Sequence, residues 1–220
     1  MIIPTWCEAD AIAAQVRHAR RIGDEVIVVD GGSSDDTAEQ ARAAGARVVT
    51  SPKGRGRQLR EGAAAAKGDV LLFLHADTTL EHGARDAIEG VLADRAVVGG
   101  NFLLRFDPPD LWGRVFDTAN DLRRRALAIY YGDSAIFVRR SVYDAIGGFR
   151  DQPLMEDFDL VKRMEAAGLT AYIREVRAWS SARRFRDAPV KTLATWALVQ
   201  GLYSAGMSAE ALAKLYEDIR

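Results

Sequence analysis

Short runs of apolar, largely β-branched residues alternate with helical patterns in the first third of the chain, and this alternation constrains the fold more than any other feature. The runs lie at residues 25–30, 47–50 and 69–74. Continuous apolar runs of this length suit strands that are buried on both faces. Because the intervening segments are long enough for crossover helices, the sequence predicts an α/β fold with a mostly parallel sheet flanked by helices.

Length and composition indicate one large domain rather than two. The chain has 220 residues, of which 48% are hydrophobic and 28% charged, so it can bury a two-sided core. Regular alternation weakens past Leu104, which predicts an irregular second half. Helical patterns at 156–167, 190–205 and 209–219 then predict helices that close the chain.

The charge of the chain bears on nucleic acid as a partner, and its cysteine content bears on the cellular compartment. The formal net charge is -1, so no global excess of positive charge favours nucleic acid. Cys7 is the single cysteine, which excludes an internal disulfide and indicates a reducing, cytoplasmic compartment. The chain begins without a secretory pattern and has no apolar stretch of spanning length, so a soluble protein without a membrane span is expected.

Polar residues follow three of the predicted strands at the point where each strand ends. They are Thr5 and Glu8 after the first strand, Asp30 before two glycines after the second, and His75 and Asp77 after the run at 69–74. In open α/β sheets, ligands bind beyond the carboxyl ends of the strands. These five residues are therefore the first candidates for a binding site.

Asp30, Asp77 and His75 are candidates for contact with a nucleotide or a metal ion. Asp30 either accepts hydrogen bonds from a base or ribose hydroxyl or caps a turn, and the two are equally weighted. Asp77 can hold a divalent cation such as Mn²⁺ or Mg²⁺ that neutralises a diphosphate. His75 is the second candidate ligand, although a hydrogen bond that fixes its tautomer is favoured over ligation.

Two basic segments and one acidic segment complete the candidates. Residues 53–60, with Arg57, suggest a glycine-bearing phosphate loop, and Arg183 and Arg184 can clamp a diphosphate; a solvated loop and surface pairing are the alternatives. Glu156 and Asp157 open a helix, where they either complement its dipole or supply a general base. No dinucleotide fingerprint or P-loop pattern is present.

In order along the chain, these pieces resemble the signatures of family 2 glycosyltransferases. The matching segments span roughly residues 1–185 and are Ile2-Ile3-Pro4-Thr5 with Glu8, residues 28–37, Gly132-Asp133 before a strand, Gly147-Gly148-Phe149, and residues 156–160. The chain is most similar to a small bacterial subgroup associated with arsenosugar biosynthesis and with radical-SAM and selenium-related genes. The ordered set is more specific than any single segment.

The resemblance implies a single glycosyltransferase-A (Rossmann-like) domain with a mostly parallel mixed sheet. Residues 1–187 would form the catalytic domain, with a nucleotide-binding half at about 1–98 and an acceptor half at about 99–187. Residues 188–220 would form a C-terminal helical appendage. The implied activity is transfer of a sugar from a nucleoside-diphosphate donor to an acceptor hydroxyl with inversion, assisted by Mn²⁺ or Mg²⁺.

The resemblance also implies roles for individual residues. Thr5, Glu8 and Asp30 face the nucleoside, Asp77 is the metal-binding end of an Asp-x-Asp triplet, and Asp157 is the catalytic base. His75 departs from the family, because it stands where the first Asp of that triplet is expected. Arg183 and Arg184 lie where a cation stabilises the leaving diphosphate.

Other functions and partners stay open at this point. A nucleotidyltransferase or a non-catalytic nucleotide-sugar-binding protein could use the same pocket. The acceptor is a small soluble molecule or a lipid, with the small molecule favoured. The apolar C-terminal helices make a homodimer plausible.

Overall fold

A computed structural model describes residues 1–182 and 188–219 of the chain. Three parallel strands pair in the order β1-β2-β3, with bounds Ile2–Thr5, Ile27–Asp30 and Arg47–Thr50. Five further strands pair in the order β4-β7-β6-β8-β5, with bounds Val70–Leu72, Phe137–Arg139, Val97–Asp107, Leu169–Ser181 and Thr78–Leu80. A parallel bridge from Ile2 to Phe73 joins the two sets.

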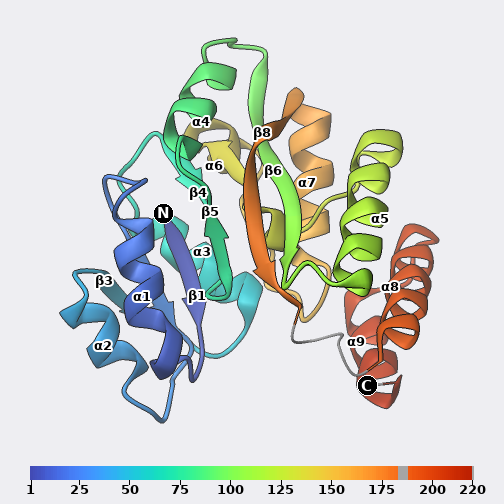
Figure 1. Cartoon of the computed structure of the whole chain (residues 1–220), viewed down its shortest axis with the longest axis horizontal. Helices are drawn as coiled ribbons and strands as arrows, with labels where there is room; N and C mark the ends of the chain where they lie inside the picture. The colour runs from blue at the N-terminus through green and yellow to red at the C-terminus, as the bar shows by residue number, and fades with distance from the viewer. Residues whose placement is uncertain (183–187, 220) are drawn as a thin grey trace.

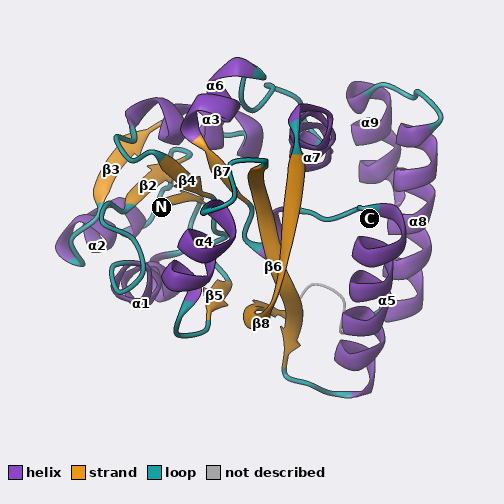
Figure 2. Ribbon diagram, turned by 90° about the horizontal axis from the view of Figure 1, so that it is seen from above, coloured by secondary structure: helices purple, strands orange, loops and turns teal. Residues whose placement is uncertain are grey.

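Helices cover both faces of this sheet (Figures 1 and 2). One core cluster packs β1 and β2 against α1 (Ala9–Ala19), α2 (Thr37–Ala43) and α4 (Ala84–Leu92). A second cluster, on the other face, contains residues of α3 (Arg55–Ala65), α6 (Arg140–Ala145) and α7 (Glu156–Ala167). The predicted α/β class with a mixed, helix-flanked sheet is confirmed.

The long strands β6 and β8 replace the irregular second half that the sequence suggested. They pair in parallel, while β7 and β5 pair antiparallel to them on either side. Gly99 and Gly100 lie where a Cβ would strike the carbonyl oxygens of Phe137 and Ala171 in the neighbouring strands. Close packing of backbones therefore explains these glycines.

Two helices begin at other residues than the sequence suggests. Residues 33–36 resemble a helix cap and first turn in the sequence, but the helix begins at Thr37, because the Ser33 amide bonds to Asp30 instead. The basic segment expected as a loop is helical from Arg55 onward. Its cations therefore occupy fixed positions on the first turns of α3.

Helix α5 (Leu111–Leu127) packs beside α8 (Pro189–Ser204), and α8 is followed by α9 (Ala209–Ile219). Phe116 of α5 meets Trp196 of α8 at 5.3 Å between ring centroids. Val199 and Leu212 pack on Met155 and Phe158 near the start of α7. Within the described ranges, no helix has the length and apolarity needed to cross a bilayer.

Candidate active site

The carboxyl ends of β1 and β2 bring Thr5 and Asp30 together, because the strands pair in register there. Both residues are buried. The Asp30 carboxylate accepts from the amides of Gly32 at 3.2 Å and Ser33 at 3.1 Å. Asp30 thus shapes the loop that follows it, and the Thr5 hydroxyl has no hydrogen-bond partner among the described residues.

Gln58 of α3 anchors this edge and was not singled out from the sequence. Its amide donates to the carbonyls of Thr5 and Val29, each at 2.8 Å. A Cβ on Gly31 would lie 3.0 Å from the same amide nitrogen, so the glycine lets Gln58 reach the strand ends. A buried polar residue inside a basic, glycine-containing run is the signal that could have revealed it.

The loop after β1 carries Glu8 and an exposed aromatic ring. The Glu8 amide donates to the Thr37 hydroxyl at 2.8 Å, which ties the loop to the start of α2. The Lys53 ammonium lies 3.1 Å from the centroid of the exposed Trp6 ring. A ring exposed beside the strand ends can stack on a nucleobase, since stacking needs only an accessible face.

The first turn of α7 holds two buried carboxylates. Glu156 is 1% and Asp157 4% exposed. The Asp157 Oδ2 accepts from the Gly132 amide at 2.9 Å, and its Oδ1 accepts from the Phe158 amide at 2.8 Å. The Asp157 carboxylate is therefore fixed in orientation, as a general base requires.

Arg55 reaches across from α3 and pairs with both carboxylates. Its Nε donates to Glu156 Oε1, and one terminal nitrogen lies 3.8 Å from Asp157 Oδ2. Burial raises the pKa of Glu156, the Arg55 charge opposes this rise, and the charge of Asp157 adds to it. Arg55 thus compensates for two carboxylates that the fold takes out of water.

Asp133, on the 3-10 turn Gly132–Ser134, joins the same cluster. Burial raises its pKa to about 6; the charge of Arg123 opposes this, while those of Asp157 and Asp77 add to it. The charges of Asp157 and Asp77 therefore both act on the Asp133 carboxylate. In the sequence, Asp133 stood only within a family signature and was not among the predicted site residues.

The His75 imidazole lies beside Gly132, close to the Asp157 carboxylate. A Cβ on Gly132 would lie 2.5 Å from His75 Nε2 and 3.5 Å from Asp157 Oδ2. A glycine at this position therefore leaves room for the imidazole and the carboxylate on either side of the turn. The structure thus brings His75 and the carboxylates of the first turn of α7 to the same turn.

The cluster suits a hard divalent cation that takes further ligands from a substrate. Among the described residues no group of three or more His, Cys, Asp or Glu could hold a metal ion by itself. Asp133 Oδ1 is buried and accepts no hydrogen bond within the described chain. One or two carboxylates, completed by phosphate oxygens and water, form the site that Mg²⁺ commonly uses.

Of the three arginines predicted to bind the nucleotide, the structure describes only Arg57. Arg57 binds the Asp151 carboxylate through Nε at 3.0 Å and a terminal nitrogen at 2.6 Å. Its contact with a nucleotide stays a prediction, since that contact would require this pair to open. Arg183 and Arg184 lie outside the described residues.

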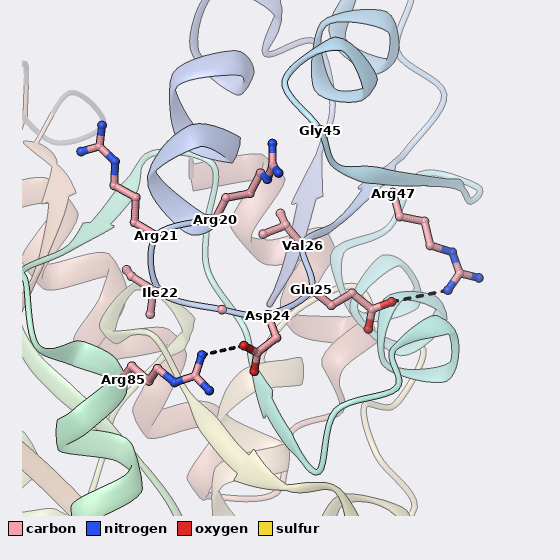
Figure 3. Close-up of a pocket in the computed structure, with 10 residues that line it drawn as sticks. Arg20, Arg21, Ile22, Asp24, Glu25, Val26, Gly45, Arg47 and Arg85 are labelled. Carbon is pink, nitrogen blue, oxygen red and sulfur yellow. Dashed lines mark hydrogen bonds and ion pairs between the residues drawn. The ribbon is translucent and has the colours of Figure 1, made fainter.

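A separate concavity of about 440 Å³ lies at the opposite, amino-terminal edge of β2 and β3 (Figure 3). Arg85 pairs there with Asp24 at 2.7 Å, and Arg47 lies 3.6 Å from Glu25. These guanidinium groups are neutralised by neighbouring acids. Arg20 and Arg21 also line this concavity, which is distinct from the carboxylate cluster.

Solved structures show the class of fold. A mannosyltransferase from Pyrobaculum calidifontis, solved with GDP-Man and Mn²⁺, matches with a TM-score of 0.72 at 19% identity, covering 94% of this chain and 64% of that one. Glucosyl-3-phosphoglycerate synthase from Mycobacterium tuberculosis, solved with Mg²⁺ and UDP, matches with a TM-score of 0.58 at 21% identity, covering 82% and 68%. The fold is of the glycosyltransferase-A type.

The family follows from the sequence comparisons. Residues 1–147 match the model of glycosyl transferase family 2, and the chain belongs to this family. The glycosyltransferase AglJ of Haloferax volcanii is 32% identical over 157 residues, which are 68% of this chain and 48% of AglJ. The rhamnosyltransferase WbaN of Salmonella anatum is 27% identical over 193 residues, covering 76% and 61%. The chain thus spans less than two thirds of the length of these curated relatives.

Proposed function

We propose that the protein transfers a sugar from a nucleoside-diphosphate donor to an acceptor hydroxyl with inversion at the anomeric carbon. Family membership supports transfer, and the observation that carries the site assignment is the meeting of His75 and the Asp157 carboxylate at Gly132, next to the buried Asp133. Relatives of this fold were solved with GDP-Man and Mn²⁺ or with UDP and Mg²⁺. A nucleotide-sugar donor is accordingly the proposed substrate class.

In this proposal Asp157 is the general base. It accepts the proton of the acceptor hydroxyl as that oxygen attacks the anomeric carbon, and the bond from this carbon to the diphosphate breaks on the opposite side. The Gly132 and Phe158 amides orient the carboxylate, while Glu156 holds Arg55 beside it. A divalent cation held by Asp77, with Asp133 or His75 adjacent, would neutralise the departing diphosphate.

The nucleotide lies at the ends of β1 and β2 in this proposal. Thr5, Glu8 and Asp30 face the nucleoside there, and Trp6 stacks on the base. Arg57 is assigned to the phosphates on its place in the basic segment, and Arg183 and Arg184 on the sequence resemblance. A nucleotidyltransferase would need cations free for a triphosphate, but Arg55 already pairs with the buried Glu156 carboxylate.

Finer assignments rest on the sequence. We assign the chain to the subgroup associated with arsenosugar biosynthesis and to the cytoplasm. We also propose that it divides into a nucleotide-binding half at residues 1–98, an acceptor half at 99–187 and a C-terminal helical appendage at 188–220. The acceptor is a small soluble molecule or a lipid. A homodimer is also part of this hypothesis.

Release of the nucleoside diphosphate from a panel of nucleotide sugars tests the function. Purified protein with Mn²⁺ should release one diphosphate preferentially, and release should increase in the presence of the acceptor. Slow hydrolysis of the donor by water can be measured even when the acceptor is unknown. If the protein binds a donor but never turns it over, with acceptor fractions of a cell extract included, it is a non-catalytic nucleotide-sugar-binding protein.

A further inference from the structure

The outer face of α5 is apolar, the reverse of what a surface helix normally shows. Leu111, Val115 and Leu122 recur at helical spacing, and Leu111 and Leu122 are 73% and 63% exposed. Ala119 and Ala126 lie on the same exposed side, with Trp112 at its edge. A helix of a soluble domain usually turns such a stripe toward the core.

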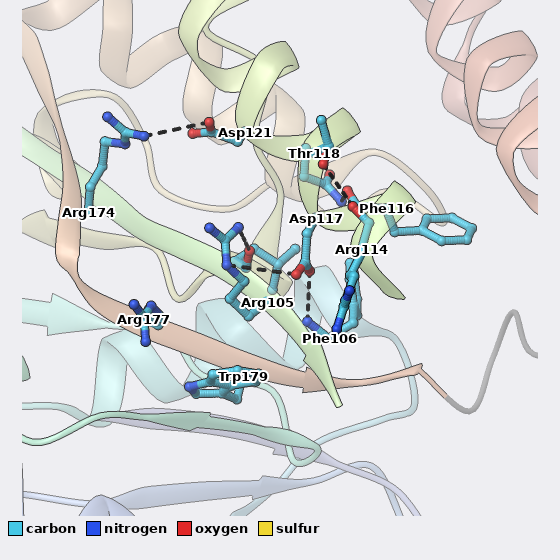
Figure 4. Close-up of polar contacts among 12 residues, drawn as sticks. Arg105, Phe106, Arg114, Phe116, Asp117, Thr118, Asp121, Arg174, Arg177 and Trp179 are labelled. Atoms are coloured by element: carbon cyan, nitrogen blue, oxygen red, sulfur yellow. Dashed lines mark hydrogen bonds and ion pairs between the residues drawn. The ribbon is translucent and has the colours of Figure 1, made fainter. Parts of the chain in front are cut away.

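The inner face of α5 is correspondingly polar. Asp117, Asn120 and Arg124 are buried against the sheet. Asp117 accepts from the Phe106 amide at 2.9 Å, as Figure 4 shows, and Arg124 Nε donates to the Asn101 side chain at 2.7 Å. Because these polar groups have partners, the helix is firmly seated and its apolar stripe has to face outward.

The neighbouring helix α8 adds to the apolar surface. Its 16 residues contain one charged residue, Lys191. Val190 and Leu198 are exposed, although α8 packs on α5 through Trp196. A helix that is apolar on all sides is normally buried, and exposed apolar patches of this kind mark interaction surfaces.

The charges beside these stripes are cationic. Among the described residues of α5 and α8, the exposed charged side chains are Arg114, Arg125 and Lys191, and Arg125 lies 3.8 Å from the partly buried Asp121. Exposed acids, Asp107 and Asp110, precede α5. An anionic surface complements the same cations.

We propose that the outer face of α5, together with α8, docks onto the surface of an anionic lipid bilayer. Leu111, Val115 and Leu122 enter the boundary between headgroups and acyl chains, and Trp112 lies at headgroup level. Arg114 and Arg125 contact anionic headgroups. The proposal concerns attachment alone and does not depend on the transfer reaction.

Co-sedimentation with vesicles tests this docking. The full chain should bind vesicles of phosphatidylcholine mixed with phosphatidylglycerol, and bind those of phosphatidylcholine alone more weakly. Leu122→Gln should weaken binding about tenfold, because a buried leucine side chain is lost from the acyl boundary. Arg114→Gln with Arg125→Gln should weaken only the charge-dependent part and reduce its sensitivity to salt.

Leu169→Gln is the matched control, since Leu169 is 62% exposed at the start of β8 and is not part of the apolar stripe of α5. It should bind vesicles like the wild type, and circular dichroism should show that all variants fold. Failure to bind the anionic vesicles, or equal weakening by Leu169→Gln, would overturn the proposal. So would a dimer in light scattering that Leu122→Gln dissociates, because this face would then bind a second copy.

Discussion

Asp157→Asn is expected to reduce turnover about 10²- to 10⁴-fold, the contribution typical of a positioned general base. The amide is isosteric and can still accept a hydrogen bond from the Gly132 or Phe158 amide, but it cannot take the proton of an acceptor hydroxyl. Glu156 continues to balance the charge of Arg55. Diphosphate release from the preferred donor measures the loss.

Asp159→Asn is the control on the same helix turn. Asp159 pairs with Arg150 and Arg163 and has no contact with Gly132 among those described. Its replacement should leave turnover near the wild-type value. Calorimetry should show that Asp157→Asn still binds the nucleoside diphosphate; equal turnover of Asp157→Asn and wild type would remove Asp157 from the mechanism.

Arg55→Ala should lower the free energy of unfolding by about 2–4 kcal/mol at neutral pH. Breaking a buried ion pair leaves an uncompensated charge, which costs about 3–5 kcal/mol when both partners are buried. Here Glu156 is buried, but the Arg55 side chain is 38% exposed, so the lower part of the range applies. Denaturant titration measures the difference.

The cost of Arg55→Ala should shrink as the pH falls. Burial raises the pKa of Glu156 in the folded protein, and losing Arg55 removes a charge that opposes this rise. The folded variant then binds a proton more tightly than the unfolded chain, so its stability rises as the pH falls through the folded pKa of Glu156. An unfolding difference that did not vary with pH would show that Glu156 is not the stranded charge.

Arg85→Ala is the matched control for Arg55→Ala. Arg85 bonds to Asp24 and Glu89 with similar geometry, but both acids are well exposed. Exposed pairs contribute about 0–1 kcal/mol. A loss at Arg85 as large as that at Arg55 would mean that burial of the carboxylates is not the cause.

The local pattern predicted strands β2, β3 and β4 in the first third of the chain, but it did not predict the long strands β6 and β8. Residues 47–50 form a strand with the predicted bounds, because a continuous β-branched run has few alternatives. Val97–Asp107 contains two glycines and an asparagine whose roles depend on neighbouring strands. Such roles arise from tertiary contacts, which a local pattern does not record.

The candidate site divides in the same way. Residues at strand ends, such as Asp30 and Asp77, could be singled out because the fold class places ligands there. Arg55 could not, since its partner Glu156 is 101 residues away in sequence. Asp133 acquires its raised pKa only when burial and two distant carboxylates meet. Contacts between residues so far apart in the sequence form only in the folded protein, and no periodic pattern in the sequence reveals them.

Calorimetric binding of UDP, GDP, CDP, dTDP and ATP, each with and without Mn²⁺, tests the central claim most directly. One nucleoside diphosphate should bind, more tightly with metal, and binding should weaken strongly in Asp30→Ala, while Asp77→Ala should lose the effect of the metal. This result would place a metal-diphosphate site at the strand ends. Binding of none of these nucleotides, or binding unchanged in both variants, would contradict the account.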